Sequence, residues 1–301
     1  MWMVMRNAAL RLTMAAVTIT AFPTIAEARP KGLPPVSALV VNAATGATLY
    51  RDAPERVRAP ASLTKMMTMF LTFEALARGD VKPNTSIRIS RHAANQPPSR
   101  LGIAPGKTLS VRNALRIMAV DSANDVTVAM AEALGGSENR FVSRMNATAG
   151  RLGLRNTHFA NATGLKNPGN RTTARDMATL SLALIHRYPE YYDVFGTRKV
   201  SWNTRTMRNH NHLLGKVTGV DGIKTGYTID AGYNLAASAK RKGVRIVVIV
   251  LGARTAADRD LRVANLLELG FIPPVVRRPK SRDETVTPSK RVKAAKTRAR
   301  P

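Results

Sequence analysis

The chain has 301 residues, and its 47 lysines and arginines outnumber its 19 aspartates and glutamates, which gives a formal charge of +28. Apolar residues make up 44% of the chain, which is too large a share for a disordered polycation and enough for a core at this length. The absence of cysteine excludes a disulfide scaffold, a thiolate zinc site and a cysteine nucleophile, and no apolar run after the N-terminus reaches the roughly 20 residues of a membrane span.

The first 28 residues have the pattern of an export signal. Arg6 and Arg11 supply positive charge, residues 12–25 are largely apolar, and residues 26–28 (Ala-Glu-Ala) form the small-x-small pattern that signal peptidase requires. An amphipathic N-terminal helix is the alternative. We predict cleavage after residue 28, so that a mature chain beginning at Arg29 acts in the periplasm or on the cell-wall side of the cytoplasmic membrane.

The body of the chain, residues 29–274, begins and ends with strand patterns. Two strands are predicted around a turn within residues 36–50, followed by a helix from Ser62 to Arg78 that is apolar on nearly all sides and therefore belongs inside a domain. The remaining predicted elements are helices 111–120, 125–134, 138–152 and 172–187, strands 222–228, 232–239 and 244–251, and helix 256–269.

This order predicts an α+β fold. The simplest arrangement is an antiparallel sheet built from both chain ends, with an inserted helical subdomain packed on it. The turn at residues 240–243 joins two of the closing strands as a hairpin.

A basic tail, residues 275–301, follows the body. Residues 277–301 contain ten lysines and arginines, two acids and almost no large apolar side chain, so we expect this segment to be disordered. Residues 29–276 still carry +19, so the positive charge is general. For an exported protein, anionic wall polymers or lipid headgroups are favoured over nucleic acid as electrostatic partners, and a solvated tail without a partner is equally open.

Ser62 and Lys65 stand three residues apart at the start of the buried helix. The first N–H groups of a helix lack partners, so Ser62 lies at the positive end of the helix dipole. A serine hydroxyl needs a base to become a nucleophile, and a lysine amine is such a base once burial or a nearby cation lowers its pKa. The pair is a candidate nucleophile and base, with a capping serine beside a solvated lysine as the structural alternative.

Ser122 and Asn124 lie in the predicted break between two helices. The hydroxyl is able to pass on a proton, and the amide is able to bind a substrate amide. Two other Ser-x-Asn triplets begin at Ser137 and Ser201, and we interpret both as helix caps or turns. The motif therefore carries little weight alone.

Lys224, Thr225 and Gly226 lie on a predicted strand, where Lys224 and Gly226 share one face. The missing side chain at Gly226 is expected to let a substrate lie against the strand as an added edge. Lys224 adds positive charge for a substrate carboxylate. A polar turn is the structural alternative.

Together the three motifs form a set shared by penicillin-binding proteins and class A β-lactamases. With residues 59–68, 209–214, 232–235 and 251–255, they make the chain resemble the low-molecular-mass penicillin-binding proteins, the serine-type D-alanyl-D-alanine carboxypeptidases of peptidase family S11. The resemblance covers about residues 33–272 and implies the β-lactamase/transpeptidase-like fold.

The resemblance implies an acyl-enzyme mechanism on peptidoglycan stem peptides, without a cofactor or metal, and covalent inhibition by β-lactams. Ser62 would attack the bond between two D-alanines, Lys65 would take its proton, and Ser122 would pass that proton to the leaving amine. The backbone N–H groups of Ser62 and Tyr227 would form the oxyanion hole. The implied substrate-binding residues are Asn124, Lys224, Thr225, Gly226, Tyr227 and Arg254.

Two features depart from the family pattern. Tyr227 stands where these carboxypeptidases often have histidine, which leaves the fine specificity open. The separate C-terminal β domain and membrane-anchoring helix of many members are also missing, so we expect weak or electrostatic association with the wall. The five histidines are interpreted as surface or core polar groups, His158 among them as a structural residue.

Three alternative functions stay open from the sequence. A DD-endopeptidase of the same family would cut peptidoglycan cross-links with the same site. A class A β-lactamase would need a deacylating glutamate, and residues 154–175 contain none. A non-catalytic polycation that binds wall polymer or nucleic acid belongs to a different class, and it does not account for the motif set.

Overall fold

A computed structural model describes residues 36–272. The predicted export signal, residues 1–28, and the predicted basic tail, residues 275–301, lie outside this range. Across the described part of the chain, none of the helices combines the length and the apolar character needed to cross a membrane.

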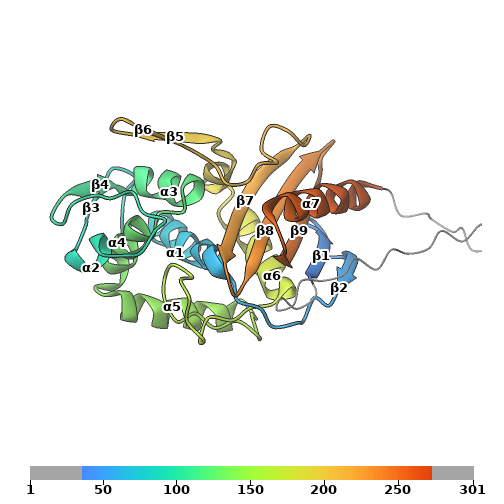
Figure 1. The fold of residues 1–301 in the computed structure, drawn as a ribbon, viewed down its shortest axis with the longest axis horizontal. Helices are drawn as coiled ribbons and strands as arrows, with labels where there is room; N and C mark the ends of the chain where they lie inside the picture. The colour runs from blue at the N-terminus through green and yellow to red at the C-terminus, as the bar shows by residue number, and fades with distance from the viewer. Residues whose placement is uncertain (1–35, 273–301) are drawn as a thin grey trace, which may run out of the picture.

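A five-stranded antiparallel sheet is built from the two ends of the described chain, as the sequence predicts (Figure 1). The strand order is β2-β1-β9-β8-β7, so β7 forms one edge of this sheet. The strands are β1 (Ser37–Asn42), β2 (Thr48–Asp52), β7 (Val220–Thr228), β8 (Gly232–Arg241) and β9 (Val244–Ala253).

The central strand β9 buries apolar side chains on both faces of the sheet, since successive side chains of a strand point to opposite faces. On β9, Val248 and Val250 belong to the same apolar cluster as residues of helix α7 (Ala256–Phe271), which lies across one face. Their neighbours Val247 and Ile249 belong to a second cluster with the helical block. The sheet therefore lies between α7 and the helices inserted between β2 and β7 (Figure 1).

The inserted block contains six α-helices and two 3-10 helices in the described chain. They are η1 (Ala61–Thr64), α1 (Lys65–Ala77), α2 (Arg91–Ala94), α3 (Val111–Val120), α4 (Asn124–Gly135), α5 (Glu138–Arg151), α6 (Ala174–Arg187) and η2 (Tyr192–Gly196). Side-chain caps explain several starts: Ser110, Ser137 and Thr173 each accept a hydrogen bond from the first turn that follows. The prediction that Ser137 is a cap is confirmed.

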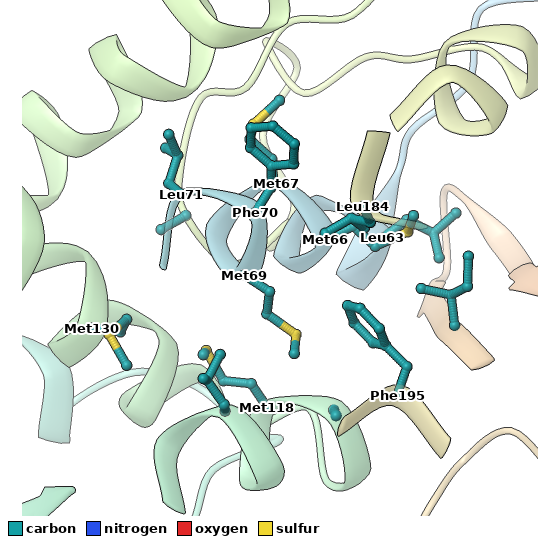
Figure 2. Close-up of a cluster of buried hydrophobic side chains, with 14 of the residues drawn as sticks. Leu63, Met66, Met67, Met69, Phe70, Leu71, Met118, Met130, Leu184 and Phe195 are labelled. Atoms are coloured by element: carbon teal, nitrogen blue, oxygen red, sulfur yellow. The ribbon is translucent and has the colours of Figure 1, made fainter. Parts of the chain in front are cut away.

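Helix α1 lies at the centre of the molecule and is buried around nearly its whole circumference, as its composition predicts. Met69 and Phe70 are 0% and 1% exposed. Figure 2 shows Met118 of α3, Met130 of α4 and Phe195 of η2 around this helix. The packing of the central helix therefore fixes the side chains at its start relative to α3, α4 and the sheet.

Two small two-stranded sheets have no counterpart among the predicted elements. They are β3 (Ser86–Arg88) with β4 (Thr108–Ser110), and β5 (Lys199–Trp202) with β6 (Arg205–Arg208). Their strands have only three or four residues, and each buries only one of them, so they leave almost no periodic apolar signal. Figure 1 shows the β5–β6 hairpin projecting away from the sheet on the side of α3.

Candidate active site

Ser62 lies in the 3-10 turn η1, just before α1, rather than in the first turn of the α-helix as predicted. Two glycines allow neighbouring segments to approach this turn closely. A Cβ atom at Gly164 would lie 1.8 Å from the Ala61 carbonyl oxygen, and one at Gly226 would lie 3.0 Å from the Ser62 nitrogen. Ala61 itself has a φ of 48°, which is uncommon for a residue with a side chain. The turn is therefore held between β7 and the loop that contains Gly164.

The structure brings Ser62 and Lys65 together. A 3-10 helix has three residues per turn, so the two side chains lie on one side, with Lys65 Nζ 3.1 Å from Ser62 Oγ. The same Nζ donates to Asn124 Oδ1 and to the Thr163 carbonyl, each at 2.8 Å. Lys65 is fully buried, and burial, followed by the charge of Lys224, lowers its pKa well below the usual value. The lysine can therefore accept a proton.

Ser122 points its hydroxyl toward the same region from the break between α3 and α4. Its φ of 61° is a left-handed conformation, and its Oγ is buried without a hydrogen-bond partner among residues 36–272. Asn124 begins α4, and its Nδ2 donates to the Pro97 carbonyl at 3.0 Å while its Oδ1 accepts from Lys65. Asn124 thus helps to position Lys65, which the sequence did not predict, and its amide keeps one unused N–H for a substrate.

Lys224 is 1% exposed on the edge strand β7, with its Nζ 3.1 Å from the Thr225 carbonyl oxygen. Burial, reinforced by Arg259, lowers the pKa of Lys224 to about 7. The explanation for Gly226 needs a correction. Its missing side chain faces the backbone of η1, so glycine is needed there for packing against the nucleophile turn, and the strand's open edge is a separate feature.

A cavity of about 400 Å³ lies between β7 and the helical block, and the buried Lys65 and Lys224 are not among its lining residues. Thr225, Gly226 and Tyr227 line one side, and Ser122 and Asn124 line the opposite side. The other lining residues are Ser62, Pro98, Ser99, Gly164, Leu165, His210, His212, Thr228, Tyr233, Ala256 and Arg259. Tyr227 is 52% exposed at the rim and stacks on Tyr233 with ring centroids 4.2 Å apart.

The arginine that lines this cavity is Arg259 on α7. Arg254 follows β9 and precedes α7, where its backbone N–H donates to Asp258 at 3.3 Å, and it is not among the lining residues. Arg259 is 4% exposed, and its guanidinium is held by Asp260 through Nε at 2.9 Å and Nη2 at 2.7 Å. The sequence offered no signal for Arg259, because neither the three motifs nor the segments of the family resemblance include it.

His210 and His212 are exposed, in agreement with the interpretation of the histidines as surface or core polar groups, and both also line the cavity, which that interpretation did not include. Partial burial and the charge of Lys224 lower the pKa of His210 to about 4, so its imidazole is neutral near pH 7. Both residues stand in the segment 209–214 that contributes to the family resemblance, which was the available signal. His158 has the structural role predicted for it, with Nδ1 2.9 Å from the Gly169 carbonyl oxygen.

The buried carboxyl of Asp121 adds a charge that the sequence did not single out. Its Oδ2 has no hydrogen-bond partner in the described range. Burial raises the pKa of Asp121, and the charge of Arg205 on β6 opposes that increase. Across residues 36–272, no group of three or more His, Asp or Glu side chains is placed to hold a metal ion.

A family model described as D-alanyl-D-alanine carboxypeptidase matches residues 25–255. Among curated proteins, DacF of Bacillus subtilis is 40% identical over 240 residues, which cover 78% of this chain and 61% of DacF. DacA of Escherichia coli is 35% identical over 278 residues, covering 87% of this chain and 69% of DacA. DacD of Escherichia coli is covered to 60%, so the chain spans about three fifths of the length of several of these relatives.

Solved structures agree with this assignment. Penicillin binding protein 5 from Haemophilus influenzae is 34% identical with a TM-score of 0.77, covering 81% of this chain and 72% of that one. Penicillin-Binding Protein D2 from Listeria monocytogenes, in its ampicillin-bound form, is 32% identical with a TM-score of 0.69, covering 78% of this chain and 96% of that one. With its sheet, its inserted helices and the matched residues 25–255, the chain belongs to the D-alanyl-D-alanine carboxypeptidase family and has the β-lactamase/transpeptidase-like fold of the penicillin-binding proteins.

Proposed function

We propose that this protein is a serine-type D-alanyl-D-alanine carboxypeptidase that removes the terminal D-alanine from peptidoglycan stem peptides. The observation that carries the proposal is the contact of 3.1 Å between the Oγ of the cavity-lining Ser62 and the Nζ of Lys65, a fully buried lysine with a lowered pKa. A neutral amine at hydrogen-bond distance from a hydroxyl is the arrangement that general-base activation of a nucleophile requires.

In the acylation step, the Ser62 oxygen attacks the carbonyl carbon of the penultimate D-alanine while Lys65 takes the hydroxyl proton. The carbonyl oxygen then carries negative charge, which the backbone N–H groups of Ser62 and Tyr227 stabilise. Each such donor is worth about 3 to 4 kcal/mol in other enzymes. The C–N bond breaks, and the leaving nitrogen receives a proton through Ser122, whose buried Oγ has no other partner within the described residues.

The terminal carboxylate of the substrate binds at the cationic end of the cavity. Thr225 of β7 and Arg259 of α7 line this end, and the buried Lys224 precedes Thr225 in the strand and adds positive charge. We assign the third carboxylate contact to Arg259 in preference to Arg254, since only Arg259 is one of the cavity's lining residues. The stacked Tyr227 and Tyr233 at the other end contact the preceding residues of the stem peptide.

Water then attacks the carbonyl carbon of the acyl-enzyme while Lys65 accepts a proton from it. The bond between that carbon and Ser62 Oγ breaks, Lys65 passes the proton to Ser62 Oγ, and the shortened peptide leaves as its carboxylic acid. The loop at residues 154–175 contains no glutamate to activate water against a β-lactam ester. β-Lactams are therefore expected to acylate Ser62 and leave slowly, in keeping with the ampicillin-bound form of the Listeria relative. Because the substrate is a wall polymer, we place the activity on the cell-wall side of the membrane, as the pattern of residues 1–28 supports.

The pH dependence of acylation tests the role of Lys224. Its ammonium is protonated below its pKa of about 7, so we expect kcat/KM for a carboxylate-bearing substrate to fall as the pH rises through about 7. In Lys224→Arg, the guanidinium stays charged up to about pH 12, so this alkaline decline should disappear. The measurement is the second-order rate of acylation by a chromogenic β-lactam from pH 5 to 10, with Lys240→Arg on the exposed end of β8 as the control. An alkaline decline that is identical in Lys224→Arg would contradict the assignment.

The activity itself is tested by mass spectrometry on muropeptides. The protein and its Ser62→Ala variant are each incubated with monomeric pentapeptide and with cross-linked dimers. We expect the monomer to lose one alanine with the wild-type protein and to stay intact with Ser62→Ala. Conversion of dimers alone would reassign the enzyme as an endopeptidase, and no change in either substrate by folded protein would overturn the catalytic proposal.

A further inference from the structure

A second cavity of about 450 Å³ adjoins the active-site region. It lies between the tip of the β5–β6 hairpin, residues 202–205, and the segment 101–108, and we call it the hairpin cavity. The mechanism proposed above does not use it. Its lining residues and its location indicate which kind of ligand it would bind.

The lining of the hairpin cavity is cationic and amphipathic. It includes Lys107 and Arg205 and contains no aspartate or glutamate. Arg205 donates one N–H to the Leu101 carbonyl at 2.8 Å, and its other donors have no hydrogen-bond partner within residues 36–272. Trp202 supplies an apolar wall, and Asn203 and neighbouring threonines supply uncharged hydrogen-bonding groups. This combination favours a ligand that carries carboxylates on a partly apolar chain.

The wall between the two cavities is fixed to the catalytic groups. Ser99 lines the active-site cavity, and its carbonyl accepts from the Asn124 N–H at 2.7 Å. Two residues further on, the N–H groups of Leu101 and Gly102 in the hairpin cavity donate to the buried Asp125 carboxylate at 3.0 and 2.8 Å. Two residues span at most about 7 Å, so the cavities are neighbours along one anchored segment.

The charges of the hairpin cavity and of Lys224 are coupled through Asp121. The charge of Arg205 acts on Asp121, and the charge of Asp121 acts on Lys224. Tyr227 is three residues further along β7, about 10 Å away in an extended strand. The Lys224 end is the end that holds the carboxylate of the leaving group. A leaving group larger than one D-alanine would therefore continue from this end toward the hairpin cavity.

We propose that the hairpin cavity binds the leaving stem peptide of a cross-linked substrate, with Lys107 and Arg205 contacting its carboxylates. This inference rests on the proposed function. When Ser62 attacks a cross-link, the bond between the D-alanine carbonyl carbon and the side-chain amine of the second stem breaks, and that amine departs with the proton. A released D-alanine fills only the active-site cavity, whereas a second stem is long enough to reach the hairpin cavity.

A matched pair of double variants tests this inference by kinetics. Lys107→Gln with Arg205→Gln removes both cations of the hairpin cavity. Lys199→Gln with Arg208→Gln removes the same charge from an exposed cross-strand pair on the opposite face of the β5–β6 hairpin. We expect the first double variant to lower the ratio of dimer to monomer kcat/KM about tenfold, and the second to leave that ratio within about twofold. An equal change in both variants, or none, overturns the proposal.

Binding is measured independently of catalysis through Trp202. The chain has two tryptophans, so Trp2→Phe in the full chain leaves Trp202 as the sole indole fluorophore. We expect its emission to respond to a free stem tetrapeptide, and the response to weaken about tenfold when the peptide carboxylates are amidated or when Lys107 and Arg205 are replaced.

The outcomes of the two assays separate this inference from the proposed function. No fluorescence response to the tetrapeptide, or an equal response to a peptide-free glycan disaccharide, overturns the inference even if monomers are cleaved. A carboxylate-dependent response without cleavage of any muropeptide supports the binding site while the proposed function fails.

Discussion

Replacing Lys65 by methionine is expected to lower the rate at which a β-lactam acylates Ser62 about 10³- to 10⁴-fold. The Lys65 amine lies 3.1 Å from the nucleophile and has a pKa lowered by complete burial, so it is the base of the proposed mechanism. Methionine has nearly the same length and suits the apolar surroundings, but it accepts no proton. The measurement is the second-order rate of labelling by a fluorescent penicillin, followed by mass spectrometry of the intact protein.

A second substitution at this position distinguishes the role of Lys65 as a proton acceptor from the effect of its positive charge. In Lys65→Arg, the side chain stays charged at every accessible pH and is unable to serve as a base, so we expect a loss similar to that of methionine. Thr72→Val is the control for disturbance of α1, since the buried Thr72 hydroxyl donates to the Thr68 carbonyl within the helix. That variant should acylate within about twofold of wild type. Thermal unfolding identifies variants that fail to fold, and near-normal acylation of folded Lys65→Arg would contradict the role of Lys65.

Gly164→Ala is expected to damage both stability and activity. Gly164 has a φ of +80°, and a Cβ atom there would lie 1.8 Å from the Ala61 carbonyl oxygen and 2.7 Å from Thr64 Oγ1. The backbone of Ala61 is unable to move aside as a flexible side chain could, so the loop that contains Gly164 must move away from η1. That movement would also withdraw the Thr163 carbonyl from Lys65 Nζ, which it now contacts at 2.8 Å. We expect unfolding free energy to fall by about 3 kcal/mol or more and acylation to fall about 100-fold.

Gly153→Ala is the matched control for this prediction. Gly153 has nearly the same conformation, with a φ of +75°, but a Cβ atom there would meet no heavy atom of a non-adjacent residue within 4 Å. It should therefore show the conformational cost alone, about 1 to 2 kcal/mol, with normal acylation. Urea unfolding and penicillin labelling of both variants give the comparison. Equal effects of the two substitutions would mean that the contact with η1 does not position the nucleophile.

The sheet and the principal helices could be predicted from the sequence, because an element that buries one or both faces has apolar residues at regular spacing along the chain. The predicted helix at 111–120 has the bounds observed for α3, and the predicted strand at 244–251 lies within β9. Nearly continuous apolar residues mark β9 because both of its faces are covered, one by α7 and the other by the helical block. The two short two-stranded sheets were not predicted, because their strands bury too few residues to produce such a pattern.

The chemical groups of the site are already evident in the sequence: a serine and a lysine three residues apart, a second serine before an asparagine, and a lysine on a strand. Only the tertiary structure shows that Asn124 accepts a hydrogen bond from Lys65 and that Gly226 allows β7 to pack against η1. It also shows that Arg259 and His210 line the cavity. The reason is physical: local spacing records which neighbours along the chain share a face, whereas contacts between β7, α4 and α7 depend on how separate elements pack. Desolvation follows from that packing as well, so the lowered pKa of Lys65 is a property of the folded molecule.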